Sequence, residues 1–389
     1  MKTFDCIIIG GGMVGASSAL SLAQLGLKIA VIEKVEPFAF SIEQAFDLRV
    51  SAISLSSQYL LESIGAWPLI KGMRSCPYQR LGVWEQEKSY IEFNAENISQ
   101  SYLGHIVENR IIQLALWEKI KTNENIELFC PEAVNKFDQN ESEVLVNLES
   151  QVIKGKILIA ADGANSVIRQ QTGIGITGWD YGQAAMLINV ETEYPQQNIT
   201  WQQFRTTGPV AMLPLAGNNA SLVWYNNKSE VNRLSSLSNS QLCLEVNQQF
   251  PEKLGHIKQV IAKGAFPLTR RHANHYQQGQ VILIGDAAHT INPLAGQGVN
   301  LGFKDVLALK NVIAEAIGNG EMWHSELVLS RYEQLRRPDN LLMMTTMDAF
   351  YGVFSHSSNF VKSFRNAGLS FINKSSRIKN KALAYACGI

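Results

Sequence analysis

The sequence predicts an α/β protein in which a Rossmann-type nucleotide-binding domain carries an inserted, mostly antiparallel β-sheet domain and ends in a helical C-terminal region. Three observations lead to this prediction. The chain opens with an apolar strand, a glycine-rich turn and a helix. Residues 179–267 are then rich in Trp, Tyr, Phe, Asn and Gln within strand-like runs. Finally, α/β patterning returns at "GQVILIGDAAH", and helical spacing dominates from about residue 300.

The start of the chain has the pattern of a βαβ unit. Residues 4–9 form a short apolar strand, and residues 13–25 have helical spacing that ends at Gly26, a typical helix stop. Residues 28–32 form a second strand, which ends at Glu33. We therefore expect the parallel sheet of a nucleotide-binding domain to begin here.

The middle of the chain predicts an interleaved architecture. Residues 105–122 have helical spacing, and residues 126–160 alternate in the manner of strands. The runs "AAMLINVETEY", "TWQQFR", "VAMLPL" and "SLVWYNN" predict antiparallel strands. The predicted units are a discontinuous nucleotide-binding domain (1–75, 105–178 and 268–320), a sheet domain (76–104 and 179–267) and a C-terminal helical region (321–389).

The composition argues against several classes of protein. Lys plus Arg and Asp plus Glu both total 34, so net charge gives no indication of nucleic-acid binding. The five cysteines are dispersed without the spacing of a metal site, which is typical of reduced thiols in a cytoplasmic protein. The apolar run near the start lacks the basic leader of a signal peptide, and no other run is long and apolar enough to predict a membrane span.

The first chemistry-bearing motif is Gly10-x-Gly12-x-x-Gly15. After a strand, such glycines allow a tight turn, a close approach of backbone to a pyrophosphate, and close packing of the helix on the strand. The free N–H groups at the helix start then face the phosphates. Glu33 ends the next strand, where an acid can hydrogen-bond ribose hydroxyls, so the motif favours NAD or FAD over NADP. A glycine-rich turn without a ligand is the alternative.

Two further motifs follow apolar strands later in the chain. Asp162-Gly163 is by itself only a turn signal, with Arg169 in solvent as its simplest placement. Asp286 ends the strand of "VILIGDAAH", at the edge where open α/β sheets bind ligands. The following "AGQGVN" exposes backbone N–H groups at a helix start, and such groups stabilise an anionic ligand atom. For His289 we expect a structural hydrogen bond, since no partner pattern for nucleophilic or metal chemistry accompanies it.

In this order, the three motifs resemble those of the class A flavoprotein monooxygenases, whose best-known member is para-hydroxybenzoate hydroxylase. Within this class the chain is most similar to the ubiquinone-biosynthesis hydroxylases, over nearly its whole length. The similarity is carried by "RVSAISLSSQYLLESIGAW", "VENRIIQLALW", "FPLTRRHA" and "GDAAHTINPLAGQGVNLGFKD". It implies a para-hydroxybenzoate-hydroxylase-like fold, in which the Rossmann-type domain binds FAD and the inserted sheet domain binds the substrate.

The resemblance implies FAD as the cofactor and gives roles to individual residues. Gly10, Gly12, Gly15 and Glu33 would hold the pyrophosphate and the adenosine ribose, and Asp286 the ribityl chain. The other implied cofactor contacts are the backbone of Gly296, Gln297, Gly298, Val299 and Asn300 at the flavin pyrimidine edge, and Arg49, Arg110 and Asp162 near the cofactor. For the two arginines, an ordinary surface ion pair is the alternative.

The implied reaction is hydroxylation of the ring of a polyprenylated quinol in ubiquinone biosynthesis. It would use O2 and NAD(P)H or another reductant, and proceed through a C4a-hydroperoxyflavin without a catalytic acid–base side chain. Segments such as "CPYQRLGVWE", "TWQQF" and "ASLVWY" favour the 3-methyl-6-methoxy-benzoquinol step. Candidates for the substrate pocket wall are Met212, Leu213, Pro214, Phe266 and Pro267. The core of the sheet domain is an equally good interpretation of each.

Other functions stay open at this point. The chain could act at a different ring-hydroxylation step of the same pathway, or on a small phenolic compound. A flavin reductase or dehydrogenase would keep the fold and change the reaction. A non-catalytic scaffold of a quinone-biosynthesis complex is a third interpretation, which the intact glycine motif and Asp286 disfavour.

The C-terminal segment predicts an association that is also left open. Residues 349–389 contain six Lys or Arg and no Asp or Glu, with aromatic and aliphatic residues between them. One interpretation is a basic amphipathic helix on an anionic membrane, at the inner face of the cytoplasmic membrane. A second is a helix packed on the protein with a solvated basic face, and a third is docking onto other quinone-biosynthesis enzymes.

Overall fold

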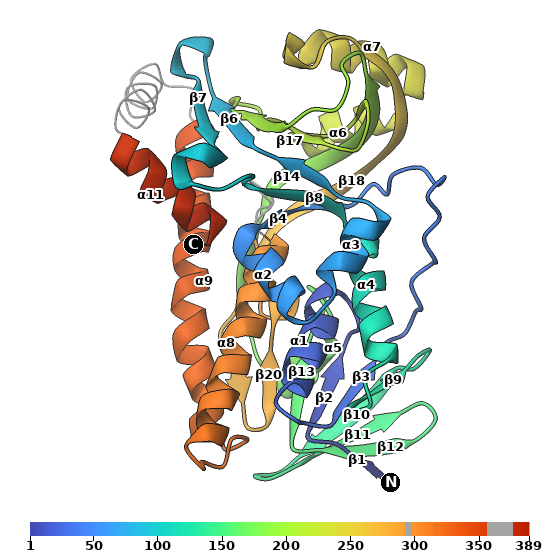
Figure 1. The fold of residues 1–389 in the computed structure, drawn as a ribbon, viewed down its shortest axis with the longest axis vertical. Coiled ribbons are helices and arrows are strands. Elements are labelled where there is room, and N and C mark those ends of the chain that lie inside the picture. Colours follow the sequence, from blue (N-terminus) through green and yellow to red (C-terminus); the bar gives the residue numbers. More distant parts are fainter. Residues whose placement is uncertain (292–297, 356–375, 389) are drawn as a thin grey trace.

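The computed structural model describes residues 1–291, 298–355 and 376–388. A nucleotide-binding unit with a parallel sheet occupies one half of the molecule, and a large antiparallel sheet occupies the other (Figure 1). The long helix α9 (Glu326–Ser355) runs along one side and reaches from the first half to the second (Figure 1). The predicted α/β class with an inserted antiparallel sheet is confirmed.

The first half is built on a six-stranded sheet with the strand order β19-β20-β13-β2-β3-β9. Every neighbouring pair is parallel except β19 and β20. Four of the strands are buried along their whole length, which is why they appear in the sequence as unbroken apolar runs. The strands are β2 (Cys6–Ile9), β3 (Ile29–Ile32), β9 (Ile126–Phe129), β13 (Ile157–Ala160), β19 (Gln277–Gln278) and β20 (Val281–Leu283).

Helices and two small sheets surround this parallel sheet. Helix α1 packs between α4 and α8, which come from distant parts of the sequence. The helices of this half are α1 (Met13–Ala23), α2 (Leu55–Ser63), α3 (Trp67–Met73), α4 (Asn109–Lys121), α5 (Val167–Thr172) and α8 (Gly298–Gly318). The small sheets contain β1 (Lys2–Thr3), β10 (Val134–Gln139), β11 (Val144–Leu148) and β12 (Val152–Gly155) in one, and β4 (Val50–Ser54), β5 (Cys76–Tyr78) and β8 (Gly104–Glu108) in the other.

The second half is an eight-stranded sheet with the order β21-β18-β14-β17-β16-β15-β6-β7. All of its neighbours are antiparallel except β15 and β6. The strands are β6 (Arg80–Trp84), β7 (Ile91–Asn94), β14 (Ile176–Thr192), β15 (Ile199–Gln203), β16 (Val210–Pro214), β17 (Asn219–Asn227), β18 (Ile257–Ala273) and β21 (His289–Thr290). The sheet thus joins β6 and β7 with strands that lie between residues 176 and 273, and β21 adds residues 289 and 290. The predicted domain division stays a prediction.

The two faces of this sheet have different neighbours because side chains alternate along each strand. One face holds Met212 and Trp224 in a core covered by α6 (Lys228–Ser236) and α7 (Asn239–Gln249). The opposite face, called here the apolar face, is made of Tyr181, Ala185, Leu187, Ala211, Leu213, Val223, Tyr225, Phe266 and Leu268. At Leu213 it meets the sheet that contains β4, β5 and β8.

The described part of the C-terminal region packs on the protein. Helix α11 (Ser376–Cys387) buries Leu383 and Cys387 against Leu55 and Leu103. The remainder of the basic segment, residues 356–375, lies outside the described residues. Among the helices that the structure describes, none combines the length and the apolar character that crossing a bilayer requires. Membrane association stays a prediction.

The two faces predict different effects of truncating adjacent residues. Met212→Ala is expected to lower the free energy of unfolding by about 2–4 kcal/mol, since Met212 is 0% exposed and its removal leaves a cavity. Leu213→Ala is expected to have a smaller effect, because Leu213 is only partly buried. Urea denaturation of both variants measures this difference. Equal losses would contradict the assignment of Met212 to the core beneath α6 and α7.

Candidate functional site

The glycine turn after β2 has two glycines that leave no room for a side chain. A Cβ atom on Gly10, which has φ +104°, would lie 2.4 Å from the carbonyl oxygen of Ala161. A Cβ atom on Gly15 would lie 2.0 Å from the carbonyl oxygen of Gly10. These two glycines therefore allow α1 to pack against β2 and β13.

The third glycine of the motif faces open space. A Cβ atom on Gly12 would meet nothing within 4 Å, and Gly12 is the N-cap of α1 without a side-chain cap. The first N–H groups of the helix are therefore free to bind an anion, and backbone can approach a pyrophosphate here. This geometry is the one that the motif predicts.

Neighbouring side chains hold the turn in place. Trp117 and Gln113 of α4 both donate hydrogen bonds to the carbonyl oxygen of Gly11, at 2.7 and 3.0 Å. From the end of β3, Glu33 accepts the N–H of Gly11 at 2.7 Å. Glu33 thus lies beside the glycine turn, at the position where the sequence predicts a ribose contact.

Asp162 begins the turn after β13, and one of its carboxylate oxygens is unused. Oδ2 accepts the N–H groups of Val167 and Ile168, at 2.8 and 3.2 Å, and so stabilises the start of α5. Oδ1 is buried and has no hydrogen-bond partner among the described residues. A buried acceptor without a donor is costly unless a ligand supplies one.

Arg169 is not in solvent, although that is its simplest placement from the sequence. It is buried and donates to the carbonyl oxygen of Ala287 at 2.8 Å and to that of Ala164 at 3.1 Å. The guanidinium therefore joins the turn after β13 to the turn after β20. Sequence spacing gives no signal for this contact, because its acceptors are backbone carbonyls more than 100 positions apart.

Asp286 lies at the carboxyl end of β20, in the short turn η4 (Gly285–Ala287). Its side chain is exposed to solvent, yet protein surrounds it on most sides. The pKa of Asp286 is raised, chiefly by this burial, while attraction to His289 and Arg49 acts in the opposite direction. Arg49 thus lies near enough to Asp286 to lower the pKa of its carboxyl group.

The four motif positions lie side by side although they are far apart in sequence. Strands β20, β13, β2 and β3 are neighbours in that order and all run parallel. Their carboxyl ends carry, in the same order, Asp286, Asp162, Gly10 and Glu33. With neighbouring strands about 4.8 Å apart, the row spans about 15 Å. The edge therefore suits one elongated ligand rather than two separate ones.

A buried acid that the sequence analysis missed supports this edge. Asp305 of α8 is 0% exposed and accepts the N–H of Gly285 at 3.0 Å. His289 Nε2 lies 2.5 Å from the same carboxylate, so the expected structural hydrogen bond of His289 is confirmed. Arg336 of α9 donates to the other carboxylate oxygen at 2.8 Å. Burial acts to raise the pKa of Asp305, but His289 and Arg336 outweigh it, so the pKa is lowered.

Arg110 forms an ion pair within the protein, which is the alternative to a cofactor contact given above for this arginine. Its guanidinium makes two hydrogen bonds of 2.8 Å to Asp47 and two more to the carbonyl oxygens of Phe38 and Ala39. It therefore attaches the segment between β3 and β4 to α4. A cofactor contact of Arg110 stays a prediction.

The start of α8 is described from Gly298 onward, and Gly296 and Gln297 lie outside the described residues. The side chain of Asn300 is buried and bonds Ala52, Ser54 and Ser57, so it fixes this helix start to β4 and α2. Val299 packs against the core, and a Cβ atom on Gly298 would meet nothing within 4 Å. Backbone contacts of these residues with a flavin stay a prediction.

The five predicted pocket-wall residues are divided between different environments. Leu213 and Phe266 lie on the apolar face. Met212 lies in the core on the opposite face, Pro214 is buried, and Pro267 is exposed. Only the first two thus lie on the face where a substrate wall would have to be.

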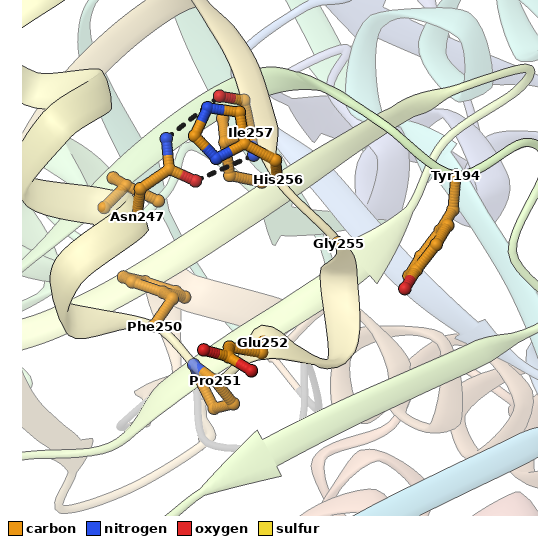
Figure 2. A pocket seen from close by; sticks show the side chains of 9 residues that line it. Tyr194, Asn247, Phe250, Pro251, Glu252, Gly255, His256 and Ile257 are labelled. Carbon is orange, nitrogen blue, oxygen red and sulfur yellow. Dashed lines mark hydrogen bonds between the residues drawn. The ribbon is translucent and has the colours of Figure 1, made fainter.

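A pocket of about 300 Å³ lies elsewhere, in the second half of the molecule (Figure 2). Its walls come from α7, η3 (Glu252–Leu254) and the start of β18, with Tyr194 on one side (Figure 2). Asn247 bonds both backbone groups of Ile257, at 2.8 and 3.0 Å, so its amide is already used by the protein. None of the motif residues lines this pocket.

The fold and the glycine edge define a dinucleotide-binding oxidoreductase, and the comparisons make the class specific: an FAD-dependent monooxygenase. A family model described as "FAD binding domain" matches residues 3–345, and the chain belongs to that family. It is 44% identical over 386 residues to the 3-demethoxyubiquinol 3-hydroxylase of Escherichia coli (strain K12), covering 99% of this chain and 98% of that protein. It is 30% identical over 433 residues to the human ubiquinone biosynthesis monooxygenase COQ6, covering 98% and 92%.

Solved structures of similar fold include a monooxygenase. The p-nitrophenol 4-monooxygenase PnpA of Pseudomonas putida DLL-E4 superposes with a TM-score of 0.79 at 19% identity, over 98% of this chain and 97% of that one. At this identity the likeness shows the fold alone. The predicted class A flavoprotein family and its para-hydroxybenzoate-hydroxylase-like fold are confirmed.

The residues present fit FAD. Gly12 leaves space for a pyrophosphate at a helix start. The buried Oδ1 of Asp162 has no hydrogen-bond partner among the described residues, and a hydroxyl group of FAD could donate to it. Glu33 at one end and Asp286 at the other would hold the ribose and the ribityl region. These individual roles stay predictions.

Replacing Gly12 or Gly15 by alanine is expected to affect two different properties, the affinity for FAD and the stability of the protein. Gly12→Ala is expected to destabilise the FAD-free protein by about 1 kcal/mol at most and to weaken FAD binding about tenfold or more, since the new Cβ enters the open space. Gly15→Ala is expected to destabilise the protein itself. Fluorescence titration with FAD and thermal melting of the FAD-free forms separate the two effects. FAD affinity unchanged in Gly12→Ala would contradict a pyrophosphate at this turn.

Asp305 predicts a large and pH-dependent contribution to stability. Asp305→Ala is expected to lower the free energy of unfolding by about 3–5 kcal/mol, because it breaks the buried ion pair with Arg336 and leaves the N–H of Gly285 and the ring of His289 without their partner. Since the folded-state pKa of Asp305 is lowered, its contribution is present above the unfolded-state pKa, about 4, and is lost as the pH falls through the folded-state value. Denaturation curves for wild type and Asp305→Asn, measured below about pH 4, test this. Parallel curves would exclude Asp305 as a source of acid sensitivity.

Proposed function

We propose that the protein hydroxylates the ring of a polyprenylated quinol in ubiquinone biosynthesis, at the step that acts on the 3-methyl-6-methoxy-benzoquinol. The observation that carries this proposal is the 44% identity, over nearly the full length of both chains, to a 3-demethoxyubiquinol 3-hydroxylase. A quinol with one methoxy group is a demethoxy form of a ring that finally carries two. The step predicted from sequence and the name of that relative therefore describe the same kind of ring.

The apolar face supports a lipid-like aromatic substrate. Its partly buried members include Leu187, Leu213 and Phe266 on one side of the eight-stranded sheet, and the strand after Asp286 joins the edge of that sheet. A quinol ring between this face and the cofactor would be shielded from water. Such shielding protects oxidised intermediates and holds reacting atoms in place.

Bound FAD, once reduced, supplies the activation of O2 and the transfer of one oxygen atom to the ring. The chain itself binds and orients. The start of α8 contributes the positive end of its helix dipole, and Asp286 holds the ribityl end of the cofactor. We propose NAD(P)H as the electron donor, and O2 and the quinol as the other substrates.

We also propose that the protein works at the inner face of the cytoplasmic membrane, in contact with other quinone-biosynthesis enzymes. The basic segment 349–389 and the polyprenyl chain of the proposed substrate support this location. A different ring-hydroxylation step of the pathway is the second candidate function. It is favoured by the similarity to the COQ6 monooxygenases and to the ubiquinone hydroxylase UbiL of Rhodospirillum rubrum, 33% identical over 388 residues.

Deletion of the gene, followed by mass analysis of quinone precursors, tests the step. The expected result is accumulation of a methylated demethoxyquinone that lacks the last ring hydroxyl. Accumulation of an earlier phenol would overturn the proposed step in favour of the second candidate.

Purified protein tests the chemistry. With FAD, NAD(P)H and a short-chain demethoxyquinol, we expect O2 consumption matched by a product one oxygen atom heavier. NAD(P)H oxidation without this product would indicate a reductase or dehydrogenase. Protein that takes up no FAD would indicate a scaffold.

A further inference from the structure

A buried arginine lies at the end of the apolar face. Arg270 is 5% exposed and lies on β18, where Leu268 and Phe266 precede it at alternate positions and so point to the same side. Directly across on β14 is Trp179, whose ring lies 4.3 Å from the guanidinium carbon of Arg270. The indole thus covers one flat side of the guanidinium and holds its plane.

The guanidinium has a counter-ion but no set of aligned acceptors. Its Nε lies 2.8 Å from Asp348 Oδ2 of α9, and the hydroxyl of Tyr181 donates to the other oxygen of Asp348. The Nε–H is buried but not aligned for a hydrogen bond. Nη1 and Nη2 are not among the buried atoms, and they form no hydrogen bond with the described residues, so a ligand can reach them. Five N–H donors in a nearly buried position normally find partners, so an acceptor from a ligand fits here.

The position of Arg270 relates it to the cofactor edge. The next residue of β18, Arg271, pairs with Thr290 of β21, the strand that begins three positions after Asp286. Ile291 then packs with Leu301 and with Met344 of α9, four residues before Asp348. Arg270 therefore lies between the apolar face and residues 289–291, which follow Asp286.

We propose that Arg270 is a specificity-determining residue that donates hydrogen bonds from its Nη groups to an oxygen substituent of the quinol ring. Trp179 and Asp348 are positioning residues that hold the guanidinium toward the ring. Arginine offers donors and no acceptor, so the site selects a ring with an oxygen at that point and rejects one without it. This inference rests on the proposed function and adds the residue that reads the ring.

The test uses the FAD-loaded protein and the variants Arg270→Met and Arg270→Lys. Binding of a short-chain demethoxyquinol is measured from the change in flavin fluorescence. Arg270→Met is expected to raise the Kd about 10- to 100-fold, since it removes a charged donor, and Arg270→Lys is expected to lie between Met and wild type. Arg233→Met is the control, because Arg233 lies on α6 in an exposed ion pair with Glu230.

Two analogues identify the oxygen that Arg270 binds. One replaces the methoxy oxygen with a methylene group, and the other lacks one ring hydroxyl. In the wild type, one of the two analogues is expected to bind more weakly than the parent quinol. In Arg270→Met this difference is expected to disappear, which is the result of a double-mutant cycle for a direct contact. FAD content and melting temperature are measured for both variants. If Arg270→Met folds poorly, Arg270→Lys with values close to wild type is compared with wild type instead.

The outcomes separate the inference from the proposed function. An unchanged Kd in both variants, or additive losses for both analogues, would overturn the role of Arg270 while leaving the hydroxylase intact. Wild-type protein that neither binds nor hydroxylates the quinol would overturn the proposed function and the inference with it.

Discussion

The site depends on one buried carboxylate, that of Asp305. It binds the backbone of Gly285, the ring of His289 and the guanidinium of Arg336, and so connects the turn after β20 to α8 and α9. A lone ionised acid at 0% exposure would be strongly unfavourable, and it is stable here because three side chains, those of His289, Arg336 and Asn340, and one N–H surround it. Through this contact the turn that carries Asp286 is held at the edge of the parallel sheet.

The motifs lie close together in the fold although they are far apart in the sequence. Gly10 and Asp286 are separated by most of the chain, yet only β13 lies between their strands in the sheet. The eight-stranded sheet accounts for much of the intervening length, and it returns to the nucleotide-binding half through β18 and β21. One elongated cofactor can therefore touch both turns.

Much of this arrangement is predictable from sequence because its signals are local. Gly10 and Gly15 have to be glycine in a strand–turn–helix unit, and the buried strands are unbroken apolar runs. Side-chain partners across the fold have no such signal. Asp305 resembles an ordinary exposed acid beside Lys304, and only packing shows that it is buried. Met212 and Leu213 are both apolar, and they point to opposite faces because side chains alternate along a strand. Which of the two points into the core depends on the strand register, which local composition does not determine.

A comparison with Arg110 and Arg169 shows how Arg270 differs from these two arginines. Arg110 fills its donors with Asp47 and two carbonyl oxygens, and Arg169 with the carbonyl oxygens of Ala164 and Ala287. Both therefore serve the fold, since their hydrogen bonds join separate turns and loops of the protein. Arg270 is as buried as Arg169, but only a counter-ion and an aromatic ring hold it. The stability of the fold alone does not account for a buried cation with free donors, whereas a ring oxygen bound at the end of the apolar face does.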